Sequence, residues 1–513
     1  MKRMAAILAL AATALLLASC AEPRPPASLP AELREIMSAN RAIALPSLHP
    51  DFDIVVDGLL TQGFDQETAA RVAELTSRQA LARGGAVRRF PSPTDTLSHA
   101  LIAEEIHYFF DLLRYLYVGY QFFGGDAVFL PMRDAMLERL AGTSDPLRVS
   151  AYLSGLLIPP LREAIGDNHF SVNGTTLEAP RHGLFMNDEI ILRRGGSGFV
   201  AEIDGEAYRL VETITHDGRV AEGVLPTIAR NGEFVFAFGY FSEIDAFGDR
   251  EMTAVLENAA TGKRRSEIVG LRLVDSPVQE STAPAGTYVV GREANGVKII
   301  ENRSLLTAEG GEPDCEPFFR LGYAARGRPV VVIDLRGHRG GFIAPAAGLF
   351  YGLTGRTPIS GSAFASFALD SPARLADLEP APRLPGDLPP GWRAEVPFVE
   401  SAPIPHENVV IVLTDNRTAS AGDMAVGYLR QLENALFVGT NTSGNLVAGY
   451  MSPETRIALP RSGAEIAFGG WLNLRPDLSR FEGVGFLPDL WVPPGESLER
   501  VLAFVERYGL ARR

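Results

Sequence analysis

The pattern of apolar and polar residues changes twice along this 513-residue chain, and each change predicts a different kind of structure. Between about 31 and 166, apolar residues recur at the i, i+3, i+4 spacing of amphipathic helices, as at Ile102, Ile106 and Phe109. From about 183 to 280, short alternating runs are broken by Gly, Asn and Asp, which is typical of strands joined by turns. From about 287 onward, β-branched runs alternate with helical segments, which predicts an α/β layout with a parallel sheet.

These patterns predict three folded parts. They are a helical N-terminal domain at 31–182, a small β-rich middle module at 183–280 and an α/β core at 287–513. In the core, buried strands are expected at 329–336, 409–413 and 435–438, with helices at 344–353 and 423–432. A segment rich in Pro, Ala and Ser at 357–405 is expected to be a long excursion from the core.

The N-terminus predicts a targeting segment. Lys2 and Arg3 precede an apolar stretch that ends in Leu17-Ala18-Ser19-Cys20, which resembles a bacterial lipobox. That resemblance implies a signal peptide at 1–19, lipidation of Cys20 and a proline-rich tether at 20–30. The mature chain would then be a lipoprotein of the cell envelope, at the outer membrane or on the periplasmic face. The alternative is ordinary secretion with cleavage nearby.

Composition narrows the possible functions. A formal charge of −14 argues against a nucleic-acid-binding surface. The eight His and two Cys are dispersed without metal-ligand spacing, and no phosphate-binding or dinucleotide fingerprint occurs, so we expect neither a metal nor a cofactor. If Cys20 is lipidated, no intramolecular disulfide can form with Cys315.

Ser420 is the first candidate for chemistry. It follows an apolar strand and a polar turn, and a helix-compatible run comes after it. A hydroxyl at such a junction is exposed and lies near the positive end of the helix dipole, which suits a nucleophile. The alternative is an ordinary N-cap serine.

The glycine-rich segment Asp334-Leu-Arg-Gly-His-Arg-Gly-Gly341 is the second candidate. It follows a buried strand, and its glycines would let backbone amides point into a cavity, as an oxyanion hole requires. The alternative is a tight turn between a strand and a helix. Asp334 and Arg336 are expected to fix this turn through a buried ion pair.

Four segments, taken together, resemble the tail-specific (C-terminal-processing) serine proteases and their relatives, which include the tricorn core. They are 334–341, 416–423, 438–444 and 485–489, in the order and spacing of that family. The resemblance covers about 287–495 and is weaker over 100–175. It implies an α/β core of the ββα type with a crotonase-like spiral. It also implies a serine peptidase that cleaves polypeptides through an acyl-enzyme, with Ser420 as nucleophile and the amides of Ala421 and of Gly340 or Gly341 as oxyanion donors.

The general base separates two branches of that family. The better-known branch uses a lysine about 25 residues after the serine, where this chain has Ser443-Gly-Asn-Leu446. Lysine occurs only at positions 2, 263 and 298, so 48 − 3 = 45 of the basic residues are Arg, and a Ser–Lys dyad is excluded.

The tricorn-like branch uses histidine, and this chain matches its motif at Asp167 and His169. An imidazole with a pKa of about 6.5 suits the base, and activity would then be lost below about pH 6. The resemblance implies that Glu482 orients the imidazole, with Asn168 as a further candidate for the relay. His169 could instead be a structural histidine at a helix end.

Several alternatives remain open at this stage. His338 and His406 are rival bases, and both are also compatible with structural or surface roles. The middle module could bind peptide as a PDZ domain does in relatives. The whole chain could also be a non-catalytic relative that binds a ligand or partner, with the aromatic segment 106–123 as a groove. The sequence does not indicate the oligomeric state.

Overall fold

The computed structural model describes most of the three predicted parts of the chain. The described residues are 29–42, 92–117, 119–120, 122–177, 181–196, 198–215, 223–244, 250–274, 289–305, 307, 313–358, 364–367, 392–395, 404–449, 456–469, 471–473 and 481–511. The predicted signal peptide, Cys20, nearly all of the tether and most of the 357–405 excursion lie outside these residues.

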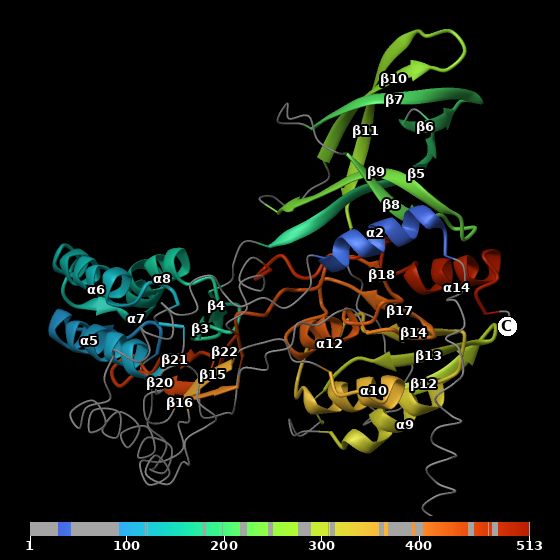
Figure 1. Ribbon diagram of the computed structural model, residues 1–513. Helices are drawn as coiled ribbons and strands as arrows, with labels where there is room; N and C mark the ends of the chain where they lie inside the picture. Colours follow the sequence, from blue (N-terminus) through green and yellow to red (C-terminus); the bar gives the residue numbers. More distant parts are fainter. Residues whose placement is uncertain are drawn as a thin grey trace, which may run out of the picture.

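A six-stranded sheet forms the centre of the core (Figure 1). Its strand order is β12-β13-β14-β17-β18-β23, in which β12 and β13 are antiparallel and the other neighbours are parallel. The predicted buried strands are all present in it. The strands are β12 (Val289–Ala294), β13 (Val297–Asn302), β14 (Val330–Asp334), β17 (Val409–Thr414), β18 (Ala435–Gly439) and β23 (Leu490–Trp491).

Helices cover both faces of this sheet, which explains why its strands are apolar on both sides. Alternate residues of β14 face opposite layers: Val331 and Ile333 pack with α9 (Cys315–Ala325), α10 (Ala344–Thr354) and α12 (Ala421–Leu429). Val330 and Val332 pack on the other face with α14 (Ser497–Arg507). The helix expected at 423–432 begins at Ala421, directly after Ser420.

One predicted domain assignment differs from the structure. Helix α2 (Ala31–Ala42) was expected to belong to the helical domain, but its Leu33 and Met37 are buried against the core sheet beside α14. Arg194 of the middle module also pairs with Glu32 of this helix at 2.6 Å. An amphipathic pattern predicts a buried face without specifying its partner, so the sequence alone could not place α2.

The described residues between 99 and 164 are mostly helical. The elements of this part share one apolar core with residues from the second half of the chain, among them Val447, Ile457 and Phe468. The elements are α5 (His99–Leu116), α6 (Gly125–Ala141), α7 (Val149–Ala151), a π-helical turn (Tyr152–Leu157) and α8 (Ile158–Ala164), with a short pairing of β1 (Thr96–Leu97) and β2 (Leu147–Arg148).

A small antiparallel sheet joins the helical domain to the core, in the order β20-β21-β3-β4. The strands β20 (Arg456–Ala458) and β21 (Glu465–Ala467) come from the core, and β3 (Ser171–Val172) and β4 (Thr175–Thr176) come from the helical half. The antiparallel pairing sets Ile466 opposite Val172. This pairing fixes the position of the segment that immediately precedes β3.

The middle module consists of strands in its described residues. Its sheet has the order β11-β10-β7-β6-β5-β9-β8, and it closes on itself because β11 also pairs with β5. The strands are β5 (His182–Gly195), β6 (Gly198–Ile203), β7 (Glu206–Thr215), β8 (Val224–Ile228), β9 (Phe234–Glu243), β10 (Arg250–Asn258) and β11 (Arg264–Leu273).

The predicted excursion contains two described strands, and one of them pairs with a strand of the core. β15 (Phe364–Phe367) and β16 (Trp392–Glu395) pair with each other, and β15 continues to β22 (Trp471–Asn473), which pairs with β19 (Ala448–Gly449).

Glu105 of α5 strengthens the junction between the two halves. Its fully buried carboxylate accepts hydrogen bonds from the backbone amides of Arg461 and Ser462 at 2.5 and 2.8 Å. The neighbouring Glu104 also reaches Arg461, through an ion pair between exposed side chains. Burial raises the pKa of Glu105, and the amides oppose that rise.

We predict that Glu105→Ala destabilises the protein far more than Glu104→Ala does. The first change leaves two amides of the junction without their acceptor, that of Ser462 at a buried position, which should lower the free energy of unfolding by about 2–4 kcal/mol. The second removes an exposed ion pair and should cost about 1 kcal/mol or less. Urea unfolding of both variants measures the difference, and equal losses would contradict the role assigned to Glu105.

Candidate active site

Ser420 lies in the turn between β17 and α12, as the last residue before the helix. Its backbone has φ 55° and ψ −116°, a conformation that non-glycine residues rarely adopt. Strain of this kind is found where a strand-to-helix turn presents a nucleophile, and it persists only when neighbouring contacts hold it. The Ser420 amide donates a 2.7 Å hydrogen bond to the Asp423 carboxylate, which is one such contact.

The structure brings His169 to Ser420 across 251 residues of sequence. The Nε2 atom of His169 lies 3.1 Å from the Ser420 Oγ, within hydrogen-bond distance. His169 is 4% exposed, and burial lowers the pKa of its imidazole from 6.5 to about 4. The ring is therefore neutral at physiological pH, which is the form that can accept a proton.

Asp167 and Tyr117 hold the turn that carries His169. The Asp167 carboxylate accepts a hydrogen bond from the His169 amide at 2.8 Å, and the Tyr117 hydroxyl donates to its other oxygen at 2.8 Å. Tyr117 in turn packs edge-on against Phe170 and Phe468. Burial raises the pKa of Asp167 to about 6, against the effect of both hydrogen bonds. The motif identified Asp167, whereas nothing in the sequence indicated Tyr117.

Glu482 lies at the same site, but its hydrogen bonds differ from the expected arrangement. One oxygen accepts from the Asn168 amide at 2.8 Å, and the other accepts from the amides of Leu446 and Val447 at 2.7 and 2.8 Å. Burial, followed by the charge of Asp167, raises the pKa of Glu482 to about 8. Glu482 thus fixes the residue next to His169 through its backbone.

The glycine turn lies directly against the serine. Gly340 has φ 100°, and a Cβ at this position would lie 2.9 Å from the Ser420 Cβ, so only glycine fits. The Gly340 amide donates to the His338 Nδ1 at 3.1 Å, which leaves Gly341 as the better candidate of the two for an oxyanion donor. The Ala421 amide is in the first turn of α12, where amides have no acceptor within the helix.

The rival histidines have structural surroundings. His338 is fully buried, accepts from the Gly340 amide and, through its carbonyl, accepts from the Ala419 amide at 2.8 Å. These contacts fix the glycine turn against the serine turn. His406 accepts a 3.1 Å hydrogen bond from the Asn408 amide just before β17, at the opposite end of that strand from Ser420.

The expected ion pair below the glycine turn is confirmed. Arg336 contacts Asp334 through two nitrogens at 2.9 and 2.7 Å, and both side chains are buried. Arg303, which the sequence analysis missed, binds the same carboxylate at 2.7 Å. Two guanidinium groups therefore neutralise the buried Asp334 and fix the start of the turn.

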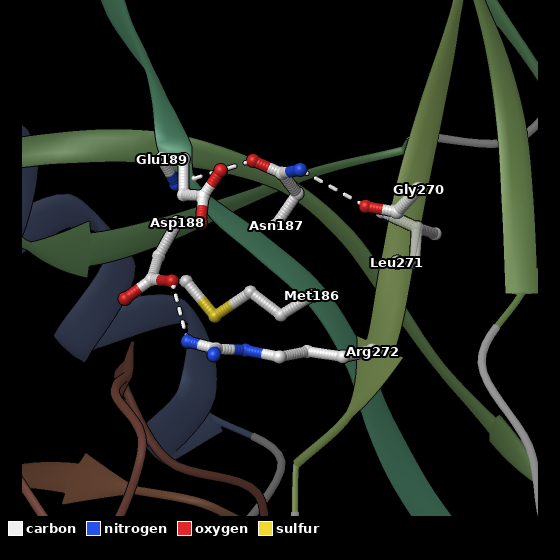
Figure 2. Close-up of a pocket in the computed structure, with 7 residues that line it drawn as sticks. All are labelled: Met186, Asn187, Asp188, Glu189, Gly270, Leu271 and Arg272. Atoms are coloured by element: carbon white, nitrogen blue, oxygen red, sulfur yellow. Dashed lines mark hydrogen bonds and ion pairs between the residues drawn. The ribbon is translucent and has the colours of Figure 1, made fainter.

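A separate cavity of about 270 Å³ lies in the middle module, where β5 bulges beside β11 (Figure 2). In Figure 2 the Asn187 amide donates to the Gly270 carbonyl, and Arg272 pairs with Asp188. Asp188 also pairs with Arg500 of α14. Since its polar groups pair with one another, this cavity carries no candidate chemistry.

Two features are absent from the described residues, a metal-binding cluster and a membrane-spanning helix. Among these residues, no three His, Cys, Asp or Glu side chains come together as they would around a metal ion. Within the same part of the chain, no helix has the length and apolar character that crossing a membrane requires.

Comparison with known proteins gives a family match over part of the sequence. Residues 320–492 match the model of Peptidase family S41. No curated protein matches the sequence. Among solved structures, mature CPAF shares 13% identity at a TM-score of 0.36, covering 80% of this chain and 96% of its own.

Two further structures are similar at comparable levels. The photosystem II D1 C-terminal processing protease shares 16% identity at a TM-score of 0.33, with 79% of this chain and 97% of its own covered. The tricorn protease shares 14% identity at a TM-score of 0.31, with 81% of this chain and 37% of its own covered. The family match spans the serine turn, the glycine turn and Glu482, so the chain contains a Peptidase family S41 domain, which indicates a serine peptidase.

Proposed function

We propose that this peptidase uses His169 rather than a lysine as its general base, and that it cleaves polypeptides of the cell envelope through an acyl-enzyme. The observation that carries the proposal is the 3.1 Å separation between the His169 Nε2 and the Ser420 Oγ. A base must lie within hydrogen-bond distance of the proton that it removes, and this pair meets that condition.

The proposed reaction follows from the positions of the groups. Ser420 Oγ attacks the peptide carbonyl carbon while His169 Nε2 accepts the hydroxyl proton. The carbonyl oxygen becomes an oxyanion, which the amides of Ala421 and of Gly341 or Gly340 would bind. The C–N bond breaks as His169 returns the proton to the leaving amine. Water, deprotonated by His169, then attacks the ester carbonyl, the bond from the acyl carbon to Ser420 Oγ breaks, and His169 returns the proton to Ser420 Oγ as the acid product leaves.

Glu482 and Asp167 would support the imidazole in two ways. Their hydrogen bonds to the amides of Asn168 and His169 fix the turn, and hence the direction of the ring. Asp167, whose pKa of about 6 leaves its carboxylate ionised at neutral pH, would also place negative charge near the imidazolium that forms during the proposed reaction, and this charge would stabilise it. In this form the orienting role expected of Glu482 is exerted through the backbone.

The other expectations from the sequence belong to this proposal. They are the tricorn-like branch, the crotonase-like spiral, peptide binding by the β-rich module, and a lipid anchor at Cys20 on the outer membrane or periplasmic face. A non-catalytic relative is the second candidate. It differs from the proposal in one testable respect, the reactivity of Ser420.

We predict that a fluorophosphonate serine probe labels the wild-type protein at Ser420. Ser420→Ala should abolish labelling, and His169→Ala should slow it by roughly 10⁴-fold, because the hydroxyl loses its base. His406→Ala is the matched histidine control, since His406 lies at the far end of β17, and it should label at close to the wild-type rate. Equal labelling of all these proteins, or no labelling and no peptidase activity in the wild type, would remove the peptidase proposal.

The buried imidazole generates a pH prediction that differs from the sequence-based one, which placed the loss of activity below about pH 6. A ring with a pKa of about 4 stays neutral between pH 8 and pH 5, so protonation of His169 does not limit activity near pH 6. NMR titration of the His169 ring in Ser420→Ala protein should show a midpoint well below 6.5. A midpoint at 6.5 would show that the ring is solvated and would contradict the buried site.

A further inference from the structure

The loop 442–447 is held by two buried carboxylates, one from each side of the active site. Asp423, in the first turn of α12, accepts hydrogen bonds from the amides of Gly444 and Asn445, both at 3.1 Å. Glu482 accepts from the next two amides along the loop, those of Leu446 and Val447. Four consecutive backbone amides thus point at two carboxylates.

Each carboxylate also accepts a hydrogen bond from the backbone close to the Ser420–His169 pair. Asp423 accepts from the Ser420 amide at 2.7 Å, and Glu482 accepts from the Asn168 amide at 2.8 Å. A continuous path therefore runs from Ser420 through Asp423, the loop and Glu482 to the turn that carries His169. Every link in it is a hydrogen bond from a backbone amide to a carboxyl oxygen of Asp423 or Glu482.

The side chain of Asn445 adds a second connection. Its Oδ1 lies 2.9 Å from the Ser443 hydroxyl and 3.3 Å from the Asn168 Nδ2, and the same Nδ2 lies 3.4 Å from the Gly444 carbonyl oxygen. The loop thus contacts Asn168 by both side chain and backbone.

We propose that the loop 442–447 is a positioning scaffold, and that Asp423 is a positioning residue that sets the distance and direction between Ser420 Oγ and His169 Nε2. This inference rests on the proposed function, because it assigns a role to groups around the same pair. An ordinary helix cap would account for the bond between Asp423 and the Ser420 amide. It does not account for the bonds to Gly444 and Asn445, which lie 21 and 22 residues away in the chain.

The energetics agree with a role beyond capping. Asp423 is fully buried, and burial raises the pKa of its carboxyl to about 6, although Thr442 and three amides donate to it. A buried charge is costly, and an apolar residue would be the more stable choice for a site that only had to be filled. The carboxylate also helps to hold Ser420 at φ 55°, where a change of backbone conformation would move the Oγ.

The test compares Asp423→Asn with Asp489→Asn. Asp489 is also buried in the core and accepts a backbone hydrogen bond, from Phe437 at 2.8 Å, but it lies outside the proposed machinery. Each protein is reacted with the serine probe, and both the rate and the final extent of labelling are measured, together with kcat and KM on an unfolded polypeptide. Asn445→Ala, at a half-buried position, is the milder variant that remains informative if Asp423→Asn does not fold.

We expect Asp423→Asn to label to the full extent but about 10²-fold more slowly, with kcat reduced and KM little changed, because a small misplacement of reacting atoms has an effect of that size. Asn445→Ala should show the same signature to a smaller degree, and Asp489→Asn should label at the wild-type rate. A reduced extent of labelling at an unchanged rate would mean that Asp423 only stabilises the fold. Wild-type rates in both Asp423→Asn and Asn445→Ala would also overturn the inference while leaving the proposed function intact. Failure of the wild type to label would instead remove the proposed function.

Discussion

The contact between the His169 imidazole and the Ser420 hydroxyl, at 3.1 Å, is the interaction on which the active site depends. Neither residue's own domain could provide it. The serine turn is built by the parallel sheet and α12, whereas the histidine turn leads into β3, which is paired to β21 from the core. The two halves are therefore fixed to each other by a strand pairing next to the catalytic pair, and the buried Glu105 reinforces the same junction.

Burial gives this pair its chemical character. The low-dielectric surroundings keep His169 neutral at rest, which suits a base. The same surroundings contain Asp167 and Glu482. Asp167 lies two residues before His169 and accepts from its amide, and Glu482 accepts from the amide of Asn168 in the same turn. In the proposed reaction, a proton on His169 would create a positive charge near the ionised Asp167 carboxylate. Desolvation disfavours the imidazolium in the resting protein, and the negative charge of Asp167 would favour it once it forms.

Local patterns predicted the elements of the core well and its long-range contacts poorly. The runs at 330–334 and 409–414 were predicted to be buried strands because they are short, apolar throughout and rich in β-branched residues. Ser420 could be singled out because a strand and a turn precede it and a helix follows it. Tyr117 and Asp423 could not be found in the same way. Tyr117 is one aromatic among many in its segment, and its bond to Asp167 spans 50 residues, while the partners of Asp423 were set by a loop with no pattern of its own.

Glu482 shows most clearly what a motif can and cannot specify. Its place in the sequence predicted a carboxylate near the imidazole. In the structure, this carboxylate accepts a hydrogen bond from the backbone amide of the adjacent residue, Asn168. The loop 443–446, where Ser–Lys relatives carry their base, offers amides to Glu482 and Asp423 instead. A chain that has no lysine after position 298 cannot supply a lysine base from that loop, but the loop still connects the carboxyl groups that bind the turns of Ser420 and His169. Holding those two residues in register is the role that we propose for it, and a row of backbone amides between two carboxyl groups would fulfil that role without depending on which side chains the loop carries.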